Sequence, residues 1–160
     1  MIIKPDYNLK CVYDINLEEL QDKGIKVIMF DLDSTIMISK SGSYRPETIE
    51  WLNEVKEKFT IAVISNNKKQ DYIEKVRGIS DFTVIGHASK PNPQKMKKYL
   101  NEQNITPDKA VMVGDRPLTD ILAGKLLGCK TILVDSINAE NENIPTRLIR
   151  RLERLFIRYW

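Results

Sequence analysis

The chain has few of the residues that build disulfide frameworks or soft-metal sites. Its 160 residues include two cysteines and one histidine. Cys11 and Cys129 stand far apart without CxxC or CxxH spacing, so we expect neither a disulfide framework nor a structural zinc site. A reducing compartment, the cytoplasm, is the simplest location for two such thiols.

Long apolar runs are also missing. No segment approaches the roughly 18 consecutive apolar residues that cross a bilayer. The first residues, MIIKPDYNLK, lack the apolar stretch of a secretory signal. We therefore expect neither a membrane-spanning protein nor one exported through such a signal.

The composition is ordinary for a globular protein. Hydrophobic residues make up 42% of the chain and charged residues 29%, which excludes collagen-like and disordered classes. The length predicts a single domain over residues 1–160, with residues 1–25 as a leading segment. The net charge of +3 is too small to indicate nucleic-acid binding, and we expect no specific nucleic-acid partner.

Short runs rich in Val and Ile alternate with helical patterns along the chain. The runs predict five buried strands, at residues 26–30, 60–64, 82–85, 110–113 and 131–134. Helices are expected at residues 17–23, 46–58, 68–77, 93–103 and 118–127. This order predicts an α/β fold, a mostly parallel five-stranded sheet with helices on both faces.

Residues 146–160 predict a basic amphipathic helix. Its apolar stripe contains Leu148, Ile149, Leu152, Leu155, Phe156 and Tyr159, and five arginines gather opposite. In one interpretation the stripe covers the sheet as a core helix and the arginines are solvated. In the other, the helix lies on an anionic membrane. We favour the core helix, because a parallel sheet needs helices on both faces.

In sheets of this kind, ligands bind at the carboxyl ends of the strands. The candidate residues that follow the predicted strands are Asp31, Asp33, Thr35, Ser65, Asn66, Lys90, Asp115 and Asp120. Asp31 and Asp33 stand two apart, so in an extended segment they point to the same side and repel each other unless a cation intervenes. Together with Asp115 they offer hard oxygen ligands without a His or Cys competitor, which favours Mg²⁺.

A carboxylate beside Mg²⁺ can attack phosphorus and form an aspartyl phosphate. Asp31 is the candidate nucleophile. Asp33 would protonate the leaving oxygen and later deprotonate the hydrolytic water. Ser65 would bind the phosphoryl oxygens, and Lys90 would balance the negative charge of the carboxylates.

The segments FDLDST, ISNN, SKPNP and VGDRPLTD resemble, in this order, the four motifs of the haloacid dehalogenase (HAD) superfamily of phosphohydrolases. The resemblance covers about residues 27–134. It is closest to the class IIIA, YqeG-type phosphatases, which are similar to phosphatidylglycerophosphate phosphatases. It implies a Rossmann-like core and Mg²⁺ held by the Asp31 side chain, the Asp33 carbonyl and Asp115, with Asp120 assisting. Thr35 and Asn66 belong to the implied phosphate-binding motifs.

The spacing of the motifs bears on the substrate. Ten residues separate Thr35 from Pro46, and about two dozen separate Ser65 from Lys90, so neither interval holds an inserted cap domain. We expect an open pocket that suits a large or lipid-borne phosphate, flanked by a small flap at residues 39–44 with Tyr44 or Arg45 beside the substrate.

Two other functions remain open at this stage. One is a phosphatase of the same chemistry that acts on a nucleotide, a sugar phosphate or a nucleic acid 3′-phosphate. The other is a non-catalytic phosphate-binding or receiver-like signalling domain. Asp33, placed two residues after Asp31, argues against the second because it suits rapid hydrolysis of the phosphoenzyme.

Overall fold

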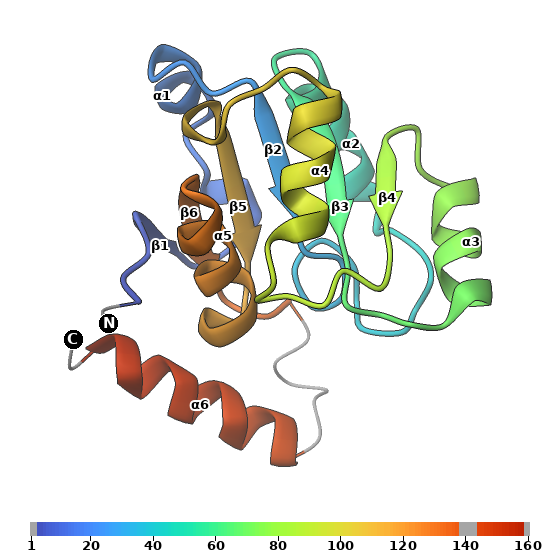
Figure 1. Cartoon of the computed structure of the whole chain (residues 1–160). Helices are drawn as coiled ribbons and strands as arrows, with labels where there is room; N and C mark the ends of the chain where they lie inside the picture. Colours follow the sequence, from blue (N-terminus) through green and yellow to red (C-terminus); the bar gives the residue numbers. More distant parts are fainter. Residues whose placement is uncertain (1–2, 138–143, 159–160) are drawn as a thin grey trace.

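The computed structural model describes residues 3–137 and 144–158 (Figure 1). Its centre is a parallel sheet with the strand order β1-β6-β5-β2-β3-β4. The strands are β1 (Tyr7–Leu9), β2 (Val27–Phe30), β3 (Thr60–Ile64), β4 (Thr83–Ile85), β5 (Ala110–Gly114) and β6 (Lys130–Val134). The predicted α/β class and all five predicted strands are confirmed.

The sheet has six strands rather than the predicted five, because the leading segment contributes β1. This strand pairs with β6 at the edge of the sheet, with Asn8 opposite Leu133. It is only three residues long and half-buried, so it carries no apolar run. Asp6 attaches the segment to the sheet: its Oδ2 accepts a hydrogen bond from the Thr131 backbone N–H at 2.8 Å and pairs with Lys125 Nζ at 3.0 Å.

Helices cover both faces of the sheet, as predicted (Figure 1). One face packs against α1 (Leu17–Asp22), α2 (Pro46–Lys56) and α3 (Gln70–Gly78), and the other against α4 (Gln94–Glu102) and α5 (Leu122–Leu127). Side chains of β2 point alternately to the two faces of the sheet. Ile28 and Phe30 pack on the side of the first group of helices, and Val27 and Met29 on the side of the second. Short turns η1 (Val12–Asp14) and η2 (Pro107–Lys109) precede α1 and β5.

The predicted helix over residues 118–127 is divided into two parts. It begins as a π-helical turn, η3 (Pro117–Ile121), and continues as α5. The left-handed Gly128, at φ 92°, ends α5. The π turn directly follows Asp115 and therefore belongs to the candidate site.

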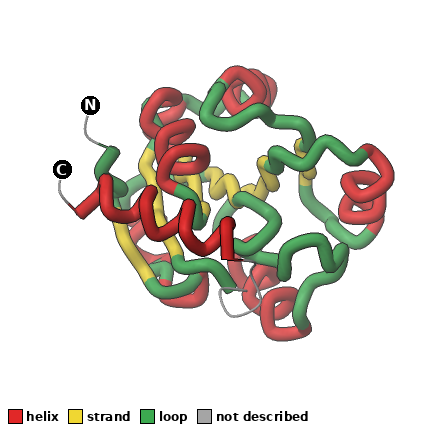
Figure 2. The backbone as a smooth tube through the Cα atoms, turned by 90° about the horizontal axis from the view of Figure 1, so that it is seen from below, coloured by secondary structure: helices red, strands yellow, loops and turns green. Residues whose placement is uncertain are grey.

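The last helix, α6 (Ile144–Arg158), does not lie on a sheet face. It crosses below the carboxyl ends of the strands in Figure 1, and Figure 2 shows it in front of the sheet when the molecule is viewed from below. Its apolar side chains point away from the core: Leu148 is 56% exposed, Ile149 48% and Leu152 50%. The interpretation as a core helix is therefore wrong. The face packed on the protein is the polar one, because Arg150, Glu153 and Arg154 find charged partners there.

None of the helices in the described ranges is both long enough and apolar enough to span a membrane.

Candidate active site

The candidate residues converge at the carboxyl ends of two neighbouring strands. Phe30, the last residue of β2, lies opposite Val113 of β5. Asp31 follows directly, and its backbone N–H donates to Val113 O at 2.9 Å. Asp115 follows β5 by one residue. The parallel register thus places the two carboxylates side by side.

Three carboxylates and one lysine form the centre of the site. Carboxylate oxygens of Asp31, Asp115 and Asp120 all lie within 4.8 Å of one another. Lys90 Nζ lies 2.8 Å from Asp31 Oδ1 and 2.7 Å from Asp120 Oδ1. The Lys90 and Asp120 side chains are each 1% exposed and Asp31 15%, so Asp31 is the most accessible member of this group. An accessible carboxylate within a buried charged cluster is suited to meeting a substrate.

Burial and mutual charge set the protonation of this cluster. Burial is the largest cause that raises the pKa of Asp120, to about 6, and the Asp31 charge adds to it, while the Lys90 charge only partly offsets both. Burial alone would lower the pKa of Lys90, but the charges of Asp120 and Asp31 outweigh it and raise that pKa. Lys90 is therefore a permanent cation at neutral pH.

The oxygen set fits a hard divalent cation. Thr35 Oγ1 donates to Asp115 Oδ1 at 3.0 Å. The other oxygen, Asp115 Oδ2, is buried and is contacted by Arg150 Nη1 of α6. The carboxylates of Asp31, Asp115 and Asp120 together offer the hard oxygen ligands that Mg²⁺ prefers.

Asp33 lies outside this group of three carboxylates. Its Oδ1 accepts a hydrogen bond from Tyr72 Oη at 2.6 Å and another from the Lys40 backbone N–H at 3.1 Å. Burial is the largest cause that raises the pKa of Tyr72, and the Asp33 charge raises it further, so the phenol stays protonated and donates. Ser34, at φ 72°, turns the chain after Asp33. Asp33 is thus held in a fixed orientation at the edge of the cluster.

The second and third motifs form one interlocked unit. Asn66 exchanges two hydrogen bonds with the Lys90 backbone, which accepts from Asn66 Nδ2 at 3.0 Å and donates to Asn66 Oδ1 at 2.7 Å. Ser65 is 2% exposed, and its Oγ accepts from the Asn67 N–H at 3.1 Å. Both polar atoms of the Asn66 side chain therefore serve to position Lys90.

The π turn η3 brings Asp120 back to the end of β5. Asp120 Oδ2 accepts from the backbone N–H groups of Asp115 and Arg116, each at 3.1 Å. A Cβ at position 114 would overlap the Asp120 side chain, so Gly114 is required for this close approach. Asp120 thus fixes the loop that carries Asp115 while its other oxygen binds Lys90.

The polar face of α6 closes over the same carboxylates. Arg150 Nη1 contacts Asp115 Oδ2, and the Arg150 side chain is only 11% exposed. Burial lowers the pKa of Arg150, and the Asp31 charge opposes that effect. Glu153 binds Arg116 Nη2 at 2.9 Å, and Arg154 binds Asp135 Oδ1 at 2.8 Å and Val134 O at 2.7 Å. We call these contacts, made by the three residues Arg150, Glu153 and Arg154, the α6 latch.

Three residues at the site, Tyr72, Arg150 and Glu153, lie outside the motifs that predicted it. Tyr72 stands in α3 without a motif around it. Glu153 could have been noticed in the sequence, because it is the one acidic residue between Arg147 and Trp160 and so indicates a basic partner. The expected role of Tyr44 beside the substrate finds no support: its hydroxyl lies 2.8 Å from Ser80 Oγ and its ring packs on Phe82.

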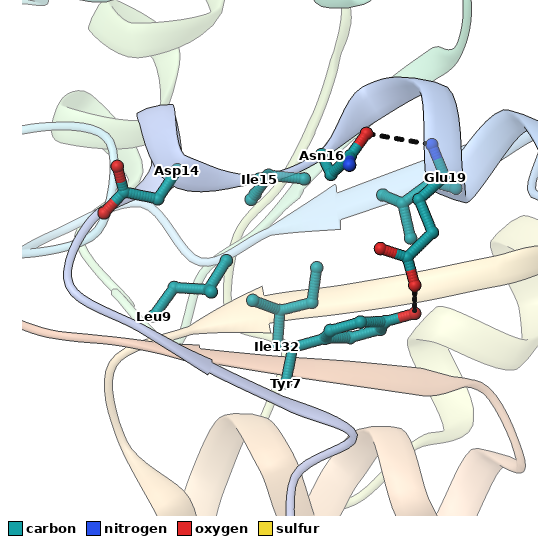
Figure 3. Close-up of a pocket in the computed structure, with 8 residues that line it drawn as sticks. Tyr7, Leu9, Asp14, Ile15, Asn16, Glu19 and Ile132 are labelled. Carbon is teal, nitrogen blue, oxygen red and sulfur yellow. Dashed lines mark hydrogen bonds between the residues drawn. The ribbon is translucent and has the colours of Figure 1, made fainter.

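A small pocket of about 80 Å³ lies elsewhere, between β1, η1, α1 and β6 (Figure 3). Three of its polar residues, Tyr7, Asn16 and Glu19, are hydrogen-bonded to each other. Glu19 Oε1 accepts from Tyr7 Oη at 2.9 Å, and Asn16 Oδ1 caps α1 by accepting from the Glu19 N–H at 3.0 Å. We assign this pocket to the packing of the leading segment.

Comparison with known proteins places this constellation in a family. A family model described as "HAD-hyrolase-like" matches residues 87–150. The chain is 31% identical over 154 residues to "Probable phosphatase YqeG" of Bacillus subtilis, which covers 94% of this chain and 87% of that protein. It is 29% identical to "Phosphatidylglycerophosphate phosphatase 1, chloroplastic/mitochondrial" of Arabidopsis thaliana over 99% of this chain, which spans about half (48%) of the plant protein.

Solved structures agree on the fold. The HAD phosphatase from Thermococcus onnurineus superposes with a TM-score of 0.57 at 17% identity, over 82% of this chain and 97% of that one. The sheet order, the four motifs and the relative from Bacillus subtilis point to the same group. The chain therefore belongs to the haloacid dehalogenase (HAD)-like hydrolases and is a phosphatase of the YqeG family.

Proposed function

We propose that the chain is a Mg²⁺-dependent phosphomonoesterase that acts through an aspartyl phosphate on Asp31 and takes a large or lipid-borne phosphate such as phosphatidylglycerophosphate. The observation that carries the proposal is the convergence of Asp31, Asp115 and Asp120 on Lys90, with Asp31 the most accessible. Residues 1–160 would act as one phosphatase unit.

Two displacements at phosphorus make up the reaction. A carboxylate oxygen of Asp31 attacks phosphorus while the bond to the leaving oxygen breaks, and Asp33 gives that oxygen its proton. Asp33 then takes a proton from water, whose oxygen attacks phosphorus and breaks the bond to Asp31. Inorganic phosphate leaves, and both carboxyl groups return to their first state.

The other motif residues position or stabilise the reacting groups. Lys90 binds Asp31 and so fixes the nucleophile and neutralises part of its charge. Ser65 would donate to the phosphoryl oxygens, with Thr35 beside Asp31 at 3.4 Å. Asn66 contributes through its hold on the Lys90 backbone.

HAD phosphatases generally use Mg²⁺, and here Asp31, Asp115, the Asp33 carbonyl and Asp120 would hold it. The bound ion would neutralise the charge that gathers on the phosphoryl oxygens. The carboxylate oxygens of Asp31, Asp115 and Asp120 lie within 4.8 Å of one another, close enough for one ion, which supports this assignment.

Two observations support a substrate carried on a larger molecule. The motifs enclose no inserted domain among the described residues, and α6 contacts the site through Arg150 and Asp115. The Arabidopsis relative is named as a phosphatidylglycerophosphate phosphatase. We accordingly propose a cytoplasmic enzyme that contacts the inner face of an anionic membrane.

The nucleophile assignment is tested with Asp31→Asn. Phosphate release should fall to the limit of detection, because an amide cannot form the acyl phosphate, while circular dichroism stays unchanged. The exposed Asp108→Asn is the matched control and should keep full activity. Full turnover by Asp31→Asn would refute the proposed chemistry.

The substrate class is tested with a phosphate-release panel, with and without Mg²⁺. The panel contains phosphatidylglycerophosphate in vesicles, nucleotides, sugar phosphates and an oligonucleotide 3′-phosphate. We expect the highest kcat/KM for the lipid. A long-lived phosphoenzyme without release would instead favour the receiver-like alternative.

A further inference from the structure

The orientation of α6 is unusual for an amphipathic helix on a folded core. Five of its apolar side chains are between 44% and 79% exposed, namely Ile144, Leu148, Ile149, Leu152 and Leu155. They form one stripe on the helix, which we call the outer stripe. Water is a poor environment for a contiguous apolar surface of this kind, and such surfaces mark interaction sites.

Charge on the flank of the outer stripe identifies the partner. Arg147 and Arg151 are both exposed and, at 100° per residue, lie along one edge of the stripe. Long arginine side chains at the edge of an apolar face are suited to phosphate groups while the apolar residues enter the acyl region. An anionic lipid bilayer offers both at once.

The latch gives the same helix a second role. Arg150 contacts Asp115 Oδ2, an oxygen that the proposed Mg²⁺ site needs. A guanidinium and a divalent cation cannot both occupy that position. The helix crosses the carboxyl ends of the strands (Figures 1 and 2), and its Arg150 contacts Asp115 from the side opposite the outer stripe, so a lipid-borne phosphate reaches Asp31 only when α6 moves aside.

We propose that α6 is a membrane-docking lid: an anionic bilayer takes up its outer stripe and draws the latch away from the carboxylate cluster. The purpose of the lid rests on the proposed function. The tests below measure binding and distance rather than turnover, so they can fail independently of that function.

Docking is tested by flotation of the full chain with vesicles. Phosphatidylcholine vesicles with and without phosphatidylglycerol are compared at low and high salt. Leu148→Gln/Leu152→Gln removes the apolar character of the outer stripe, and Ile49→Gln/Ile79→Gln is the matched control, since those two side chains are 47% and 49% exposed outside α6. We expect the wild type and the control to float with anionic vesicles, in part even at high salt, and the stripe variant to bind roughly tenfold more weakly.

Equal flotation of the stripe variant and its control would overturn the docking surface. So would a dimer in light scattering that the stripe variant abolishes, because the stripe would then serve a second copy of the chain. Circular dichroism verifies that both variants fold, as expected for substitutions of exposed residues.

The latch is tested by calorimetric titration of Mg²⁺ in the absence of lipid. Arg150→Gln should bind Mg²⁺ roughly tenfold more tightly than the wild type, because the competing guanidinium is gone. Arg147→Gln, on the exposed side of the same helix, is the control and should bind as the wild type does. Equal affinities for all three proteins would refute the competition.

Movement of the lid is tested with spin labels at Arg151→Cys on α6 and Lys97→Cys on α4, in a chain with Cys11→Ser. Anionic vesicles should shift the distance between the labels by about 10 Å, one helix diameter, and phosphatidylcholine vesicles should leave it unchanged. An unchanged distance on vesicles to which the protein binds would overturn the lid, because α6 would then dock without opening.

Discussion

At the scale of single residues, the site depends on atoms that leave no spare volume. Gly114 lies so close to Asp120 that a methyl group has no room. Gly114→Ala should lower the free energy of unfolding by about 2–4 kcal/mol, because it displaces a buried carboxylate from Lys90 and from two backbone N–H groups. Urea denaturation measures the loss.

Gly78 offers a matched comparison for this substitution. It lies at the end of α3, and a Cβ there meets no atom within 4 Å. Gly78→Ala should therefore be neutral or slightly stabilising. If both alanine variants had the same urea midpoint, crowding at position 114 would not be the cause of the destabilisation.

Tyr72 acts on the reaction through Asp33 and is a positioning residue. Tyr72→Phe removes the 2.6 Å hydrogen bond that orients the Asp33 carboxyl group. We expect kcat/KM to fall roughly tenfold for alkyl phosphates, whose leaving oxygen needs a proton, and far less for nitrophenyl phosphate, whose leaving group does not.

Tyr44→Phe is the control for that experiment, since it removes a hydroxyl that binds Ser80 instead. Tyr44→Phe should leave unchanged the ratio of kcat/KM for alkyl phosphates to kcat/KM for nitrophenyl phosphate. A similar loss on both substrates for Tyr72→Phe would indicate a merely structural tyrosine.

At the scale of elements, the leading segment is joined to the sheet by Asp6. Burial alone would raise the pKa of Asp6, but the hydrogen bonds from Lys125 and Thr131 outweigh it and lower that pKa. A carboxyl group with a lowered pKa contributes stability above its ordinary pKa and loses it as the pH falls through the folded value.

Asp6→Asn should accordingly destabilise the protein by about 1 kcal/mol at pH 7, a modest value because the side chain is partly exposed. The difference from the wild type should shrink below about pH 4, where the Asp6 carboxylate takes up a proton. Urea midpoints at the two pH values measure this. A difference that did not depend on pH would exclude the ionised carboxylate as its source.

The contrast between β1 and the other strands shows what a sequence can predict. The buried strands are continuous apolar runs, and each is followed at its carboxyl end by a motif or a turn, so both fold and site could be inferred from local patterns. β1 is half-buried and held by Asp6, a contact over 125 positions that no local pattern reports. The hydrogen bond between Tyr72 and Asp33, across 39 positions, is hidden for the same reason.

The orientation of α6 differs from the one that its sequence predicts. An apolar stripe on a helix normally indicates the core. Here the polar face of α6 forms ion pairs with Asp115, Arg116 and Asp135 at the site. These ion pairs turn the polar face, rather than the apolar stripe, toward the protein.

At the scale of the whole molecule, the core does not depend on the apolar residues of α6. A chain that ends at residue 137 should keep a cooperative unfolding transition, because the outer stripe is exposed and the latch that attaches α6 is made of charged side chains. We expect its urea midpoint to fall less than that of Leu52→Ala, a buried substitution that costs about 2–5 kcal/mol. Loss of cooperative unfolding in the shortened chain would mean that α6 belongs to the core.

The π turn η3 has a consequence for how insertions and deletions affect this chain. A π turn carries one more residue than the α-helical turn it replaces. Deleting a single residue between Pro117 and Thr119 would restore regular winding and rotate Asp120 by about 100° about the helix axis. The chain would keep nearly its whole sequence and its sheet, yet Lys90 would lose a partner, so a length change of one residue there is worse for this enzyme than most substitutions.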